Sequence, residues 1–208
     1  MSEYILMADI IKSRLKKAGA ISEKFSELVS GINVRYADRL KSPLTITLGD
    51  EFQGVCQDLK TAAQIILEME EELAVSEHKF KLRYIINYGP IDTEINPEIA
   101  YGMLGEGLAT AREGLAELKK AKGIRVGVKN MPGNRSEALV QAFFLCTSCI
   151  DAWKPEDTAL VREFLKNDDY KQVAERLNKD VSLMWRRRKS LKMDQYIASK
   201  GVINYIAK

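Results

Sequence analysis

The sequence has few of the residues that most often carry covalent or metal-dependent catalysis. It holds one histidine and three cysteines among 208 residues, and an odd number of cysteines does not build a disulfide framework. The pair Cys146-x-x-Cys149 lies in an apolar run without the second pair that a zinc site needs. No Ser-His-Asp or Cys-His set can be assembled, and no P-loop motif is present. We therefore predict that the cysteines pack in the core.

Long apolar runs are also missing. No stretch approaches the roughly 20 apolar residues that a membrane helix needs. The opening "MSEYILMADI" carries acidic groups and no basic segment ahead of a cleavage site. We therefore expect a cytoplasmic protein in a reducing environment, with no membrane partner.

Charge is divided unevenly along a chain whose net charge is +3. Residues 153–208 hold 13 Lys and Arg against 8 Asp and Glu, a net charge of +5, which leaves −2 for residues 1–152. With 46% apolar residues, the chain can form one sizeable core and a small appendage. A polyanionic partner is expected to meet the basic C-terminal part.

Strand and helix periodicities alternate through the first 130 residues. Strands are predicted at 3–10, 44–57 (a hairpin), 79–89 and 124–128, and helices at 21–36, 59–75 and 104–122. The order βαββαβαβ predicts an α+β, ferredoxin-like sandwich with helices on one face of a mostly antiparallel sheet. We divide the chain into a first domain (1–136), a connecting helix (137–152) and a small all-α domain (153–208).

Acidic residues stand at two strand ends that this topology brings together. Asp9 ends the first strand, and Gly49-Asp50-Glu51 forms the tip of the hairpin "LTITLGDEFQGV". Facing carboxylates repel unless they are protonated or bridged, and a divalent cation is the usual bridge. This pattern predicts Mg²⁺ or Mn²⁺ held by Asp9 and Asp50, with Glu51 as a third ligand or a base. Ordinary turn chemistry is the alternative explanation of Asp50.

Four segments carry a family resemblance: "MADIIKS", "TLGDEFQGV", "RYIINYGPI" and "YGMLGEGLATARE". Over residues 3–128 they resemble the palm-type catalytic domain of adenylate and guanylate cyclases and of GGDEF-type diguanylate cyclases. The resemblance implies that Asp9 and Asp50 hold two Mg²⁺ ions on a nucleoside triphosphate. Where those cyclases carry a catalytic Asn and Arg, this sequence has Ala109 and Glu113. The whole chain resembles the SatD family.

The segment after Asp9 is a candidate phosphate-binding loop. Backbone amides from Ile10 to Ser13 could cradle phosphates, with charge from Lys12 and Arg14 and a hydroxyl from Ser13. A solvated basic face is the alternative. Gly49 in the hairpin tip and Arg112 on the third helix complete the predicted nucleotide-binding residues.

The C-terminal part has the spacing of a helix-turn-helix, a motif that binds DNA. Two predicted helices meet at a turn containing Asn178, and Ala174 allows their close approach. The second helix is expected to present Ser182, Arg186, Arg187 and Lys189 to DNA. A three-helix cap with a charged surface is the alternative. The closing segment "DQYIASKGVINYIA" is expected to complete the small domain or to form a contact in a homodimer.

Two functions follow from these patterns. The first is a nucleotide-binding protein with a Mg²⁺-dependent cyclase-like palm, which in its catalytic form is a nucleotidyl cyclase or transferase, coupled to a DNA-binding helix-turn-helix. The second is a catalytically inactive palm that acts as a sensor or scaffold in a DNA-binding transcriptional regulator. The sequence leaves open whether the palm is an enzyme.

Overall fold

A computed structural model describes residues 1–11, 18–77, 80–121 and 123–208 of the chain. The strands are β1 (Ser2–Ile10), β2 (Leu40–Ile46), β3 (Glu51–Cys56), β4 (Leu82–Pro90) and β5 (Val126–Lys129). The α-helices are α1 (Ala18–Arg35), α2 (Leu59–Ala74), α3 (Glu106–Leu118), α4 (Arg135–Asp151), α5 (Thr158–Lys166), α6 (Tyr170–Leu177), α7 (Val181–Ser190) and α8 (Met193–Ile206). Short 3₁₀ turns are η2 (Ala37–Arg39), η3 (Pro132–Asn134) and η4 (Pro155–Asp157).

The five strands form one sheet in the order β2-β3-β1-β4-β5. β1 pairs antiparallel with both β3 and β4, β2 pairs antiparallel with β3, and β5 joins β4 in parallel. This is the ferredoxin-like order with one added strand, so the predicted α+β class and the mostly antiparallel sheet are confirmed. The predicted hairpin is β2–β3, with Gly49 at positive φ (+81°) in its tip.

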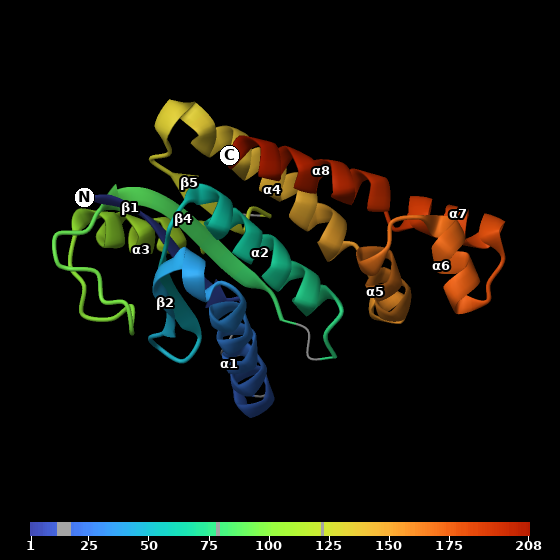
Figure 1. Ribbon diagram of the computed structural model, residues 1–208, viewed down its shortest axis with the longest axis horizontal. Helices are drawn as coiled ribbons and strands as arrows, with labels where there is room; N and C mark the ends of the chain where they lie inside the picture. Colours follow the sequence, from blue (N-terminus) through green and yellow to red (C-terminus); the bar gives the residue numbers. More distant parts are fainter. Residues whose placement is uncertain (12–17, 78–79, 122) are drawn as a thin grey trace.

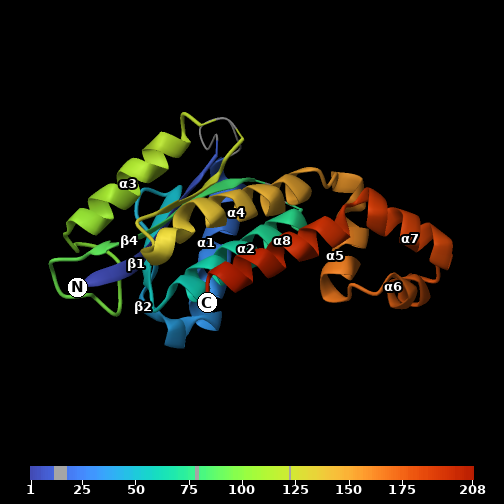
Figure 2. The same cartoon turned by 90° about the horizontal axis from the view of Figure 1, so that it is seen from above.

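Helices cover both faces of the sheet, which differs from the one-face arrangement predicted from the sequence. Leu6 and Ala8 of β1 face the core formed with α1, α2 and α4, whereas Ile5 and Met7 face α3. Figure 2 shows α3 on the opposite side of the sheet from α2. The physical reason is that β1 is apolar on both sides, and a strand with two apolar faces needs two covering layers.

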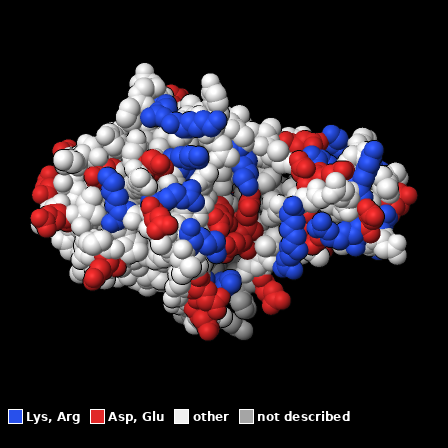
Figure 3. All heavy atoms as spheres, viewed as in Figure 1, with Lys and Arg blue, Asp and Glu red and all other residues white. Residues whose placement is uncertain are grey.

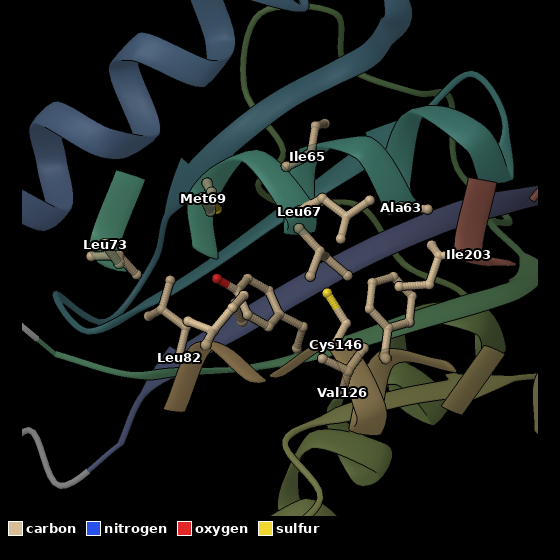
Figure 4. Packing of buried hydrophobic residues seen from close by; sticks show 14 of the residues in the cluster. Ala63, Ile65, Leu67, Met69, Leu73, Leu82, Val126, Cys146 and Ile203 are labelled. Carbon is tan, nitrogen blue, oxygen red and sulfur yellow. The ribbon is translucent and has the colours of Figure 1, made fainter. Parts of the chain in front are cut away.

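The larger core lies between the sheet and α2, α4 and α8. Figure 4 shows the Cys146 sulfur from α4 among Leu67 of α2, Val126 of β5 and Ile203 of α8. Burial raises the pKa of the Cys146 thiol to about 12, which keeps the thiol protonated and unreactive at neutral pH. Cys149 is also buried. The predicted core role of the Cys-x-x-Cys pair is thus confirmed.

A buried charge joins four elements of the body. The Arg125 side chain is 6% exposed, and its Nη2 lies 2.5 Å from Glu70 Oε2 and 2.8 Å from Asp151 Oδ1. The Tyr84 hydroxyl donates to the other oxygen of Glu70 at 2.9 Å. This cluster connects α2, β4, the segment before β5, and the end of α4.

The C-terminal helices are anchored to the body at both ends. In Figure 1, α4 leads to α5, α6 and α7 at the right, and α8 returns along α4. The Trp153 indole donates to the Leu191 carbonyl at 2.8 Å, which closes the base of the α5–α7 lobe. On α8, Tyr196 and Lys200 both bond to Glu71 of α2. The closing segment, expected in the small domain or in a dimer contact, therefore packs on α4 and α2.

Buried residues of the body and the α5–α7 lobe belong to one continuous cluster. The division of the chain into domains at residues 136 and 153 remains a prediction. Among the described residues, no helix is both long and apolar enough to cross a membrane.

Removing the buried charge should destabilise the fold strongly. We expect Arg125→Ala to cost about 3–5 kcal/mol, because Glu70 would be left buried without its cation. The matched control is Arg176→Ala, which breaks an ion pair with Glu163 whose arginine is 49% exposed, and we expect about 1 kcal/mol or less. Urea unfolding midpoints measure both. Equal midpoints for the two variants would contradict the role given to Arg125.

Candidate functional site

The end of β1 and the hairpin tip lie side by side, as the sequence predicted. Asp9 is the direct partner of Glu51 in the β1–β3 ladder. The Ile10 amide donates to the Asp50 carbonyl at 2.9 Å, which places the backbone of the hairpin tip next to the strand end. The Asp50 side chain is half-buried, and within the described part of the chain it has no hydrogen bond or ion pair.

Two protein cations neutralise Asp9. Arg83 Nε lies 2.8 Å from Asp9 Oδ1 and Arg83 Nη2 lies 3.0 Å from Oδ2, a two-point contact to a carboxylate that is 3% exposed. Lys119, just after α3, places its Nζ 3.0 Å from Asp9 Oδ2 and 3.4 Å from Glu51 Oε1. We call Asp9, Glu51, Arg83 and Lys119 the Asp9 cluster.

The Asp9 cluster holds Lys119 in its charged form. The hydrogen bond to Asp9 raises the pKa of the Lys119 ammonium, and the charges of Asp9 and Glu51 add to that effect against partial desolvation. Lys119 therefore bridges the two facing carboxylates, which is the task that the sequence assigned to a divalent cation.

The residues at this site, as placed, do not fit the predicted pair of divalent cations. Both Asp9 oxygens already accept hydrogen bonds from protein cations. No group of three or more His, Cys, Asp or Glu side chains that could hold a metal ion occurs among the described residues. The metal role of Asp9 and Asp50 remains a prediction.

Sequence reasoning missed Arg83 and Lys119. Arg83 lies directly opposite Asp9 in the β1–β4 pair, and opposite charges on facing residues of neighbouring strands attract. Aligning the predicted strands "YILMADI" and "KLRYIIN" in antiparallel register would have found it. Lys119 follows a helix and gives no comparable signal, because its position depends on how α3 packs across the sheet.

A cleft of about 640 Å³ opens beside the Asp9 cluster. We call it the α3 cleft, because one stripe of α3 forms its floor while the hairpin and the loop 101–105 form its walls. Its apolar lining comes from Leu48, Tyr101, Met103, Leu104, Leu108 and Leu115. Its polar lining comes from Thr47, Glu51, Gln53, Arg112 and Lys119. The cleft thus has two cations, one acid and an exposed aromatic ring.

Arg112 and Lys119 lie on the same face of the segment that starts with α3. They are seven positions apart, which corresponds to two helical turns and about 10 Å along the axis. Arg112 is exposed, and its one hydrogen bond within the described part of the chain goes to Gln53 Oε1 at 3.5 Å, the limit for such a contact. Arg112 is therefore held loosely and lines the cleft, and its predicted role in nucleotide binding remains a prediction.

The other predicted nucleotide-binding residues have different fates. The Ile10 amide donates to Asp50 and the Ile11 amide donates to the Lys81 carbonyl at 2.8 Å, so these amides do not cradle phosphate and that part of the prediction is wrong. Strand pairing that continues past Asp9 is the reason. Gly49 lies at the exposed hairpin tip with open space around it. Lys12, Ser13 and Arg14 lie outside the described residues.

Two short helices of the α5–α7 lobe, α6 and α7, lie where the sequence predicted the helices of a helix-turn-helix, and the motif itself remains a prediction. Val173 and Ala174 are fully buried under α7, whose Met184 is 4% exposed. Asn178 takes the left-handed conformation (φ 49°, ψ 51°) that a tight turn requires, and Asp180 caps α7 by accepting from the Leu183 amide at 2.8 Å.

The exposed face of α7 includes three of the four predicted DNA-binding residues. Ser182, Arg186 and Lys189 are exposed together with Trp185. Arg187 differs, because its guanidinium is half-buried and pairs with Asp157. Lys189 pairs with Asp194 at 2.5 Å. Figure 3 shows both signs of charge on this lobe, so its basic residues are partly neutralised by neighbouring acids.

The chain belongs to the SatD family, whose pattern it matches over residues 4–206. This confirms the membership expected from the sequence. No curated protein matches the chain.

Several solved structures of nucleotide cyclases are similar to this chain. A bacterial light-regulated adenylyl cyclase shares 14% identity and a TM-score of 0.45, over 61% of this chain and 74% of that one. The guanylate cyclase domain of RhGC from Catenaria anguillulae, solved with GTP, shares 13% identity and a TM-score of 0.42, over 61% and 77% of the two chains. Adenylate cyclases from Trypanosoma brucei share 15% identity and a TM-score of 0.40, over 53% and 65%.

The α3 cleft depends on the close approach of α3 to β4. A Cβ on Gly107 would lie 2.6 Å from the Gly89 carbonyl carbon and 2.7 Å from the Pro90 oxygen, both backbone atoms that cannot move alone. We expect Gly107→Ala to cost about 1–3 kcal/mol by forcing α3 away from the sheet.

The matched control is Gly201→Ala on α8, where a Cβ meets nothing within 4 Å. There we expect a gain of up to about 1 kcal/mol from helix propensity. Thermal and urea unfolding measure both variants. A Gly107→Ala protein as stable as the parent would show that the observed α3–β4 contact is not required.

Proposed function

We propose that the protein is a DNA-binding regulator in which α7 contacts DNA and the palm, residues 1–136, is a nucleotide-binding sensor. The observation that carries the DNA-binding part is the exposed face of α7, set on a left-handed turn at Asn178 and a capped helix start at Asp180. Helices presented in this way enter the major groove, with their first turns towards base edges.

The residues on this face have chemistry that suits DNA. Arg186 is exposed, and no hydrogen bond or ion pair within the described residues fixes its guanidinium. Arginine binds phosphates and the guanine edge, and Ser182 can bond to either base or backbone. Arg187 and Arg188 instead stabilise the lobe, because they pair with Asp157 and Asp194.

The palm part of the proposal rests on the α3 cleft. Its two cations suit a phosphate group, and the exposed ring of Tyr101 suits stacking with a flat base. Ligand binding there can reach the DNA-binding lobe because β3 leads directly into α2, and α2 holds α8 through Glu71. A homodimer, which would match a two-fold operator, belongs to the same proposal.

A Mg²⁺- or Mn²⁺-dependent nucleotidyl cyclase is the second candidate. The observation that favours it is the register that sets Asp9 opposite Glu51 and beside the Asp50 backbone. The two protein cations on Asp9 and the residues Ala109 and Glu113 on α3 favour the sensor instead.

DNA binding should depend on Arg186 more than on a basic residue outside α7. With a labelled mixed-sequence duplex, we expect Arg186→Ala to weaken affinity and to reduce the slope of log K against log salt by about one. The control is Lys154→Ala, which removes the same charge from an exposed site outside α7. Fluorescence anisotropy across a salt series measures both. If the two variants lose affinity alike, the α7 assignment fails.

Turnover should be absent in a sensor. We expect no pyrophosphate release from any of the four ribonucleoside triphosphates with Mg²⁺ or Mn²⁺, because Asp9 is neutralised by Arg83 and Lys119. A coupled pyrophosphate assay measures this, with an active cyclase as the positive control. Release that disappears in both Asp9→Asn and Asp50→Asn would establish the enzyme and reject the sensor.

A further inference from the structure

The Asp9 cluster balances its own charge. Asp9 and Glu51 supply two negative charges, and Arg83 and Lys119 supply two positive ones, all within 2.8 to 3.4 Å of a partner. Arg83 is 15% exposed and holds Asp9 by two bonds, so it is a fixed part of the sheet. Lys119 is 45% exposed and also lines the α3 cleft. Lys119 is therefore the cation of the Asp9 cluster that is accessible from solvent and from the α3 cleft.

A divalent cation on Asp9 would have to displace Lys119. That exchange separates an ion pair whose acid is almost fully buried, and Mg²⁺ would also lose hydration water to enter. Arg83 would stay and repel the incoming ion. The cluster therefore disfavours a metal at the place where the carboxylates meet.

Lys119 keeps binding capacity for an anion in the cleft. An ammonium has three N–H donors, and among the described residues Lys119 contacts two acids, Asp9 and Glu51. Arg112 presents a second cation two turns earlier on the same face, with Leu108 and Tyr101 forming apolar surface nearby. A flat ring bearing an elongated polyphosphate matches this combination of one aromatic wall and two separated cations.

We propose that Lys119 takes the place of a divalent cation, and that the α3 cleft binds the phosphates of a nucleotide through Lys119 and Arg112 without any metal ion. This inference rests on the proposed function of the cleft as the nucleotide site. It adds Lys119 to the residues of the nucleotide site. It also states that binding does not require Mg²⁺, whereas the acidic residues in the sequence predicted a Mg²⁺ site.

Calorimetric titration of the full chain with ATP, GTP and inorganic triphosphate tests the inference. Each titration is run once in EDTA and once in excess MgCl₂. We expect the same affinity, within about twofold, in both buffers. Lys119→Met should weaken binding by about tenfold or more, because a charge-assisted hydrogen bond is lost while most of the aliphatic stem remains.

Matched variants separate charge from structure. Lys120→Met removes the same charge one residue further on, at an exposed position outside the cleft lining, and should leave the affinity unchanged. Lys119→Arg should restore part of the binding that Lys119→Met loses. Circular dichroism and melting curves confirm that each variant is folded.

A metal titration gives a second readout that does not need a nucleotide. By electron paramagnetic resonance, the parent protein should leave added Mn²⁺ free in solution. Lys119→Met should bind Mn²⁺ more tightly than the parent, with an affinity that Arg83 still limits, and the double variant Lys119→Met/Asp9→Asn should lose that gain. The gain follows because Asp9 and Glu51 then face each other without the bridging ammonium.

The outcomes distinguish this inference from the proposed function. Nucleotide binding that requires Mg²⁺, together with Mn²⁺ binding by the parent that Asp50→Asn abolishes, would overturn the inference and keep the nucleotide site. Metal-independent binding that Lys119→Met leaves intact would overturn the role of Lys119. If ATP, GTP and triphosphate fail to bind in both buffers, the nucleotide assignment of the cleft fails, and the inference with it.

Discussion

A single buried guanidinium, that of Arg125, fixes α4 against α2 and the sheet. Arg125 is almost fully buried and depends on Glu70 and Asp151 for neutralisation, and those acids come from α2 and from the last turn of α4. Because a charge buried without partners is very costly, α4 must end where Asp151 can reach Arg125. The position of α4 then fixes where α5 begins and where α8 returns. The placement of the α5–α7 lobe follows from that one constraint.

The architecture joins the sheet that carries the α3 cleft to the lobe that carries α7. The α3 cleft lies on one face of the sheet, and the helices that carry the lobe lie on the other face. The sheet is therefore the physical layer between the two sites. Its central strands are packed on both sides, so a displacement on one face has to be accommodated by side chains on the other.

Much of the fold could be predicted from the sequence, because local patterns decided it. Alternation in "LTITLGDEFQGV" gave the hairpin, and the order of strands and helices gave the ferredoxin-like sheet. The one-face arrangement was wrong because "YILM" is apolar at every position, and such a strand is buried on both sides. The position of α8 along α4 depends on long-range packing, which has no local signature.

Of the residues in the Asp9 cluster, the sequence predicted only the acidic ones. Asp9, Asp50 and Glu51 could be placed together from topology, but the nature of their partner could not. Arg83 was accessible through strand register, whereas Lys119 comes from the far end of a helix that crosses the opposite face. A pattern of acids therefore suggested a metal, and the structure supplies a lysine. Similarly, "WRRRK" predicted a basic surface. The structure narrows that surface, because Asp157 pairs with Arg187 and Asp194 pairs with Arg188 and Lys189.

The lobe that carries α7 leaves the body through α4 and comes back through α8, and Trp153 fastens the two crossings together through the Leu191 carbonyl. A domain on one flexible linker can tumble and search in any orientation. A domain connected to the body by two adjacent helices can tilt about the line between its attachment points, but it cannot rotate freely. The two connections, α4 and α8, thus restrict the orientations that α7 can take relative to the sheet.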